Sequence, residues 1–213
     1  MRNLLLLITL AISLVQGCAT QEKKPIFDAN LETVKSLLSQ GEDVNNTNDS
    51  ATPLYYAAKN NRIKVVKFLL KKGAHINKGT QSSTPLSVAL EYENEEVVNY
   101  LIEKGASVSA ALFFIGYWAV GQDILPANTD FENQLNSAKK LKKLGANVDL
   151  QLEFYGNNTA LHGAVLGGSL DLVKHYLDNG AKENIINKKR QTPRMLGYVS
   201  KYTDIRDYFE NLR

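Results

Sequence analysis

The chain has 213 residues, of which 44% are hydrophobic and 22% are charged, and its formal net charge is only +3. Because acidic and basic residues nearly balance, the composition gives no electrostatic case for nucleic-acid binding. Cys18 is the single cysteine, which excludes a disulfide within the chain.

Residues 1–17 (MRNLLLLITLAISLVQG) have the pattern of an export signal. Arg2 supplies the positive charge before an apolar run at 4–15, which is too short to span a bilayer as a stable helix. The following VQGC, which ends in Cys18, resembles the bacterial lipobox, whose cysteine is lipidated and becomes the new N-terminus. Ala19, in place of an aspartate, favours the outer membrane by analogy with enterobacterial sorting. We expect a signal peptide at 1–17, a lipidated cysteine with a polar tether at 18–24 and a folded domain at 25–213; an ordinary secreted protein is the alternative.

Residues 52–77 (TPLYYAAKNNRIKVVKFLLKKGAHIN) contain two short apolar stripes at helical spacing. Thr52 and Pro53 are typical of a helix start, because threonine caps the first turn and proline fits its first position. Asn60 and Asn61 separate the two stripes, and Gly73 is typical of a left-handed helix end. One such pair of helices is too small to bury its own apolar face, so the stretch predicts neighbours that cover it.

Copies of this stretch supply those neighbours. Residues 84–109 and 159–184 repeat the pattern. Half-copies flank these, at 31–45, which keep only the second helix, and at 192–209, near the end of the chain. Repeats near 33 residues that carry T-P-L-H-x-A and G-A-x-V-N resemble the ankyrin family. The resemblance implies an all-α solenoid of about five to six stacked helix–turn–helix units with short β-hairpin-like tips. Threonines and prolines then begin helices and glycines end them: Thr52, Pro53, Thr84, Pro85 and Thr159, then Gly73, Gly105, Gly145 and Gly180.

The fourth repeat is irregular. The glycines at 41, 73 and 105 are 32 residues apart, but 40 residues separate Gly105 from Gly145. Residues 109–120 (SAALFFIGYWAV) lack the TPLH start, and 121–130 (GQDILPANTD) are predicted to form an inserted loop. A helix is expected to return at 131–145, with a buried stripe of Leu135, Ala138, Leu141 and Leu144.

Four aromatic residues lie on two consecutive helical turns of this repeat: Phe113, Phe114, Tyr117 and Trp118. Since one helical face cannot bury all four, two interpretations remain open. In the first, most of the four side chains fill extra core around the insertion. In the second, Tyr117 or Trp118 is exposed as a binding anchor, a role that fits the dominance of aromatic residues in interface hot spots.

The resemblance also implies where a partner binds, since ankyrin proteins generally bind through hairpin tips and inner helices. The matching tip and helix positions vary from copy to copy in this chain, whereas the helix starts do not. We therefore predict partner contacts at Asn48, Asp49, Thr80, Gln81, Tyr92, Tyr155, Lys188 and Lys189, together with Phe113, Phe114, Tyr117 and Trp118. Further inner-helix positions on the same face are Lys59, Asn60 and Glu91.

No catalytic motif is present in the sequence, and its three histidines are too scattered to form a metal site. His162 occupies the T-x-L-H position, where the resemblance implies hydrogen bonds within and between repeats. We expect a non-catalytic protein with no cofactor and no metal.

The leading hypothesis is a monomeric protein-binding lipoprotein, anchored through Cys18 and facing the bacterial periplasm. In a sharper version it resembles immunity proteins that neutralise an exported phospholipase-type effector. Two alternatives remain open. One resembles periplasmic ankyrin proteins of peroxide defence. The other is an envelope scaffold whose two basic clusters rest on anionic lipid. One cluster contains Lys139, Lys140, Lys142 and Lys143, and the other contains Lys188, Lys189 and Arg190.

Overall fold

The computed structural model describes residues 25–27, 29–47, 51–117 and 131–212. The predicted signal peptide, Cys18 and the loop at 121–130 lie outside these residues. The described chain forms two 3-10 helices, η1 (Pro25–Phe27) and η2 (Glu153–Tyr155), and eleven α-helices. The α-helices are α2 (Leu31–Ser39), α3 (Pro53–Lys59), α4 (Ile63–Lys71), α5 (Pro85–Glu91), α6 (Glu95–Glu103), α7 (Val108–Tyr117), α8 (Phe131–Lys143), α9 (Ala160–Gly167), α10 (Leu170–Asp178), α11 (Pro193–Tyr198) and α12 (Thr203–Asn211).

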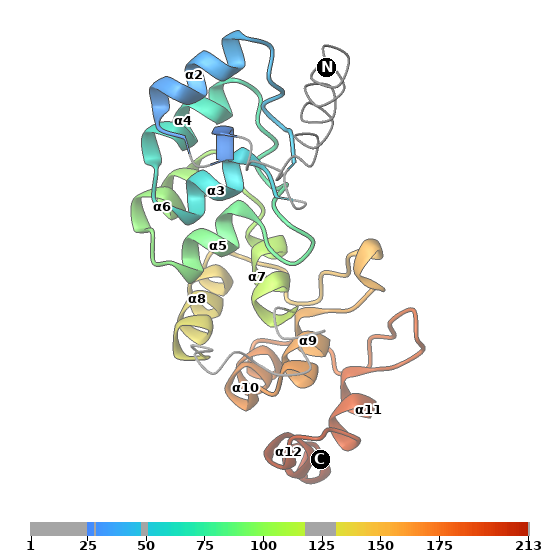
Figure 1. Cartoon of the computed structure of the whole chain (residues 1–213). Helices are drawn as coiled ribbons and strands as arrows, with labels where there is room; N and C mark the ends of the chain where they lie inside the picture. The colour runs from blue at the N-terminus through green and yellow to red at the C-terminus, as the bar shows by residue number, and fades with distance from the viewer. Residues whose placement is uncertain (1–24, 28, 48–50, 118–130, 213) are drawn as a thin grey trace, which may run out of the picture.

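These helices stack in series as antiparallel pairs, which confirms the predicted all-α solenoid (Figure 1). We call α3, α5, α7, α9 and α11 the inner helices, because the long turns extend from their side, and α2, α4, α6, α8, α10 and α12 the outer helices. Each inner helix contacts the next inner helix along the array. The first unit has no inner α-helix, and η1 packs against α2 and α3 instead. The tips are turns: one backbone hydrogen bond of 2.8 Å joins Thr80 N to Ser83 O.

Side-chain caps begin the inner helices, as the threonine pattern predicts. Thr52, Thr84, Thr159 and Thr192 each accept a hydrogen bond from the backbone N–H three residues later. In the irregular repeat, Ser107 takes this role and accepts from Ala110 N at 3.1 Å. The irregular repeat therefore has a helix cap of the same chemistry, although it lacks the T-P pattern.

A ladder of polar side chains sets the register between repeats. The glycines that end the outer helices have left-handed φ values, between +84° at Gly145 and +94° at Gly41. Two residues after each later glycine of this series, a backbone N–H donates to a side-chain oxygen of the preceding repeat, over 2.8–2.9 Å. The acceptors are Asn45, Asn77, Ser109 and Asp149. The ladder therefore continues across the irregular repeat despite its greater length.

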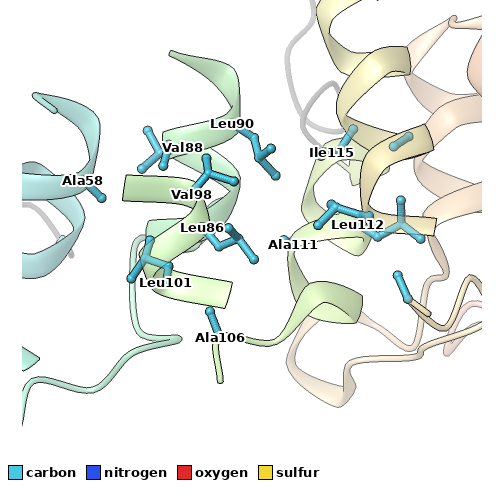
Figure 2. Close-up of a cluster of buried hydrophobic side chains, with 14 of the residues drawn as sticks. Ala58, Leu86, Val88, Leu90, Val98, Leu101, Ala106, Ala111, Leu112 and Ile115 are labelled. Carbon is cyan, nitrogen blue, oxygen red and sulfur yellow. The ribbon is translucent and has the colours of Figure 1, made fainter. Parts of the chain in front are cut away.

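Apolar side chains fill the space between the stacked units continuously. Figure 2 shows Leu86 and Leu90 of α5 beside Val98 of α6, with Leu112 of α7 extending the same core toward the fourth repeat. Because the units bury their faces against each other, the core has no boundary between repeats.

The predicted stripe of α8 is correct in part. Ala138 and Leu141 are buried and Leu135 is half-buried, but Leu144 is 47% exposed. Its predicted burial is wrong because α8 ends at Lys143, and Leu144 lies in the closing turn before Gly145. Within the described ranges, no helix is long and apolar enough to cross a lipid bilayer.

Candidate functional site

The inner helices and the turns before them lie along one side of the array, which we call the inner face (Figure 1). Its helical positions are the residues seven after each capping threonine. These are Lys59, Glu91, Leu166 and Val199. Lys59 is half-buried and the other three are exposed. The same position is therefore charged in the second and third repeats and apolar in the last two.

An aromatic and charged cluster occupies the inner face at α3 and α5. The Lys59 ammonium lies 5.1 Å from the centroid of the Tyr92 ring, whose side chain is 48% exposed. The polar interaction with the Tyr92 side chain raises the pKa of Lys59, so the lysine stays cationic. Burial raises the pKa of the neighbouring Tyr55 hydroxyl and of the Glu91 carboxyl, although Glu91 still reaches solvent. Tyr92 is thus a half-exposed aromatic ring beside the Lys59 cation, and its contact role stays a prediction.

The predicted tip residues differ in how much they present to solvent. Gln81 is exposed, whereas Thr80 is half-buried and its hydroxyl accepts from Ser82 N at 3.1 Å. Asn48 and Asp49 lie outside the described residues.

The last tip is a rigid hairpin that carries the basic residues. The buried side chain of Asn187 accepts hydrogen bonds from Lys189 N and Gln191 N, both at 2.9 Å, and donates to Asn158 at 2.9 Å. Lys188 and Lys189 are exposed as predicted, and the Lys188 ammonium lies 3.5 Å from Glu153. The hairpin therefore presents its cations from a fixed backbone.

The aromatic residues of the fourth repeat require a correction. Phe113 and Phe114 are only 1% and 6% exposed, so they cannot act as contact residues on the surface. Their rings are 5.2 Å apart, and the Tyr155 ring packs against them at 5.5 Å and 5.1 Å. Tyr155, predicted as a tip contact, is half-buried and completes this internal cluster.

Phe113 and Phe114 are both buried because α7 is covered on more than one side. It packs against α5, α8 and α9, and the turn that carries Tyr155 covers the phenylalanines. The side chain of Tyr117 and all of Trp118 lie outside the described residues. Their role as exposed anchors stays a prediction.

The histidine at the T-x-L-H position is structural. His162 is fully buried, and its Nδ1 accepts from Thr159 N at 3.1 Å while Nε2 donates to Gln191 O at 3.2 Å. Burial lowers its pKa, so the neutral ring joins its own helix cap to the next repeat. This arrangement agrees with the role that the family resemblance implies.

Two open grooves lie between consecutive outer helices. One, of about 480 Å³, is lined by residues that include Leu38, Val44 and Phe68, and the other, of about 460 Å³, by residues that include Leu177, Glu183 and Tyr208. Both lie just after the ends of an outer helix, so they are two instances of one repeat feature. In the described parts of the chain, no three His, Cys, Asp or Glu residues gather closely enough to hold a metal ion.

Comparison with known families agrees with this architecture. A family model described as ankyrin repeats, in three copies, matches residues 26–111, and one described as ankyrin repeat matches residues 156–188. The chain belongs to the ankyrin repeat family. The two matched ranges lie on either side of most of the irregular fourth ankyrin repeat. A search of curated proteins finds no significant match.

Ankyrin repeats are protein–protein interaction modules, and the family is generally a non-catalytic binding scaffold. The inner face is the surface on which this ankyrin protein exposes aromatic, apolar and charged side chains together. Sequence reasoning found Tyr92, Lys188 and Lys189, but it missed the exposed Leu166 and Val199. Alignment of the repeats on their capping threonines could have placed both at the same position as Lys59.

Proposed function

We propose that this ankyrin protein is a non-catalytic module whose inner face binds one protein partner. The observation that carries the proposal is the exposed Tyr92 ring, which lies under the Lys59 ammonium of the adjacent inner helix. A half-exposed aromatic ring with a cation over its face has the chemistry of an interface hot spot. Little conformational entropy is lost when such a side chain is buried by a partner.

We further propose that the protein is exported and anchored through a lipidated Cys18 to the outer membrane, where it faces the periplasm. The support is the sequence at 1–18, with its apolar run and lipobox-like end. Several acyl chains on one cysteine would hold the domain firmly, whereas one chain gives only marginal binding.

The partner that fits this location is an exported effector of phospholipase type, which the protein neutralises as an immunity protein. The anchor would hold the inhibitor beside the membrane that such an effector attacks. This version rests on the lipobox and on the repeat architecture together.

The test is affinity capture with the lipidated full chain, purified in detergent and incubated with envelope extract. Wild type is compared with Tyr92→Ala and with Leu144→Ala, which truncates an equally exposed side chain on the outer side. A stoichiometric protein partner that is lost only with Tyr92→Ala supports the inner face as the binding site. A partner retained by both variants contradicts that site, and the absence of any partner contradicts the binding function.

The identity of the captured partner tests the narrower proposal that the protein is an immunity protein. An effector whose lipase activity falls on addition of the ankyrin protein supports the immunity role. A captured peroxide-defence enzyme would replace that role with the stress-resistance alternative.

A further inference from the structure

The last two ankyrin repeats expose more large apolar side chains than the other described repeats. Beyond Tyr92 and Leu144, every large hydrophobic side chain that is more than a third exposed in the described residues lies between 166 and 199. They are Leu166, Ile186, Met195, Tyr198 and Val199. Val199 is 78% exposed and Ile186 is 61% exposed, so these side chains are available to a partner.

Several of these side chains lie on adjoining elements. Leu166 lies near the end of α9 and Val199 directly follows α11, at the equivalent repeat position, and the two helices contact each other. Met195 lies one helical turn before Val199 on the same face of α11. Ile186 lies on the hairpin before α11, where its carbonyl accepts from Gln151 Nε2 at 3.1 Å. The apolar side chains therefore extend from two inner helices to the adjoining hairpin.

The same segment is strongly basic. Residues 184–202 contain five basic residues and no acidic one, although the whole chain is nearly balanced. Three of the five, Lys188, Lys189 and Arg190, are consecutive and exposed on the rigid hairpin. By contrast, the third repeat carries glutamates at Glu91 and Glu93. Glu153 lies 3.5 Å from Lys188 and Glu183 pairs with Arg194, so the excess positive charge of the segment is concentrated at the hairpin residues Lys189 and Arg190.

We propose that this apolar–basic surface, formed by Leu166, Ile186, Val199 and residues 188–190, binds an acidic amphipathic segment of the partner protein. The inference rests on the proposed function, since it names the chemistry of the partner at the inner face. Apolar side chains of the segment would cover Leu166 and Val199, and its carboxylates would face the hairpin cations. Charge complementarity of this kind selects partners and speeds their association.

An anionic membrane is the other class of surface that basic and apolar residues attract. The arrangement of the backbone disfavours a membrane, because the turns project beyond α9 and α11 (Figure 1). A flat bilayer would meet the tips before it reached the inner helices. A narrow protein segment can contact the hairpin and both helices at once.

The experiment selects a random peptide library on the full chain in detergent micelles, with empty micelles as the blank. We expect the enriched peptides to combine acidic and apolar residues. A synthetic copy of the best peptide should bind about tenfold or more weakly to a Leu166→Lys, Val199→Lys variant and to a Lys188→Glu, Lys189→Glu variant. The fold tolerates lysine at the first two positions, because Lys59 occupies the same position in the second repeat.

Two matched controls separate this surface from general effects of charge. Leu144→Lys introduces the same side chain at an exposed position after α8, and Lys64→Glu with Lys71→Glu reverses two exposed cations on α4. Both controls should retain wild-type affinity for the peptide. Circular dichroism of every variant should show the wild-type helical content.

Basic or uncharged enriched peptides would overturn the proposal, as would acidic peptides that bind all variants equally. The proposal would also be overturned if wild type enriched no peptides more strongly than the Leu166→Lys, Val199→Lys variant does. If the library yields no enriched peptide, and phosphatidylglycerol vesicles bind wild type but not the Lys188→Glu, Lys189→Glu variant, the surface binds lipid instead. The captured partner could bind the Leu166→Lys, Val199→Lys variant and the hairpin variant normally but fail to bind Tyr92→Ala. In that case the proposed function stands and this inference fails.

Discussion

Replacing Phe113 by alanine should destabilise the protein strongly, because the ring fills the centre of the fourth repeat. Its side chain is 1% exposed and packs against Phe114 and Tyr155 at centroid distances of 5.2 Å and 5.5 Å. Emptying a buried phenylalanine site costs about 3–5 kcal/mol, and the lost ring pairs favour the upper part of that range. Since domains are stable by only about 5–15 kcal/mol, this is a large share of the total.

Urea unfolding followed by circular dichroism measures the loss. Tyr92→Ala is the matched control, because its ring is 48% exposed and its removal leaves no cavity. Its free energy of unfolding should therefore stay within about 1 kcal/mol of wild type. If Phe113→Ala does not fold, Phe113→Leu keeps much of the apolar area and should show a smaller loss in the same direction. A wild-type unfolding midpoint for both Phe113 variants would refute the burial argument.

Three further predictions follow from the contacts between repeats. Gly116→Ala should lower the unfolding midpoint measurably, because a Cβ there would lie 2.5 Å from the carbonyl oxygen of Ala160; an unchanged midpoint would refute the close approach of α7 and α9. Asn94→Ala should cost about 1–3 kcal/mol in the same assay, because its buried amide donates to the Ala58 carbonyl at 2.7 Å, and a change near zero would contradict that role. Burial holds the pKa of His162 below its usual value, so the unfolded chain binds more protons below about pH 6.5 and stability should fall from there toward the folded pKa. His162→Ser, which copies the third repeat, should make thermal unfolding less pH-dependent in that window; an unchanged slope would exclude His162 as a source.

Local chemistry determined most of the fold. The threonine caps, the glycine helix ends and the apolar stripes each act within a few residues, and three registered copies showed that the units must stack. Thr52, Gly73 and Leu69 therefore lie where their residue types require. The prediction of mainly helical repeats needed no tertiary information, because each repeat contacts only its neighbours.

The candidate site was predictable in part for the same reason. Tyr92, Lys188 and Lys189 are exposed at positions that vary between copies, and the comparison of copies was enough to find them. Leu166 and Val199 also lie at a position that varies between copies, but an apolar residue at a helical position is first predicted to be buried. Their exposure depends on whether another element covers that side of the inner helices.

Only the tertiary structure showed that the two phenylalanines of the fourth repeat are buried. Phe113 and Phe114 point from adjacent sides of α7, and helical geometry alone leaves one of them uncovered. Tyr155, which lies about forty residues later, supplies the missing cover. Burial depends on contacts between segments far apart in the chain, whereas caps and turns depend on neighbours in sequence. The sequence by itself therefore determined the repeats and their ends, and the packing between repeats decided which side chains remain available to bind.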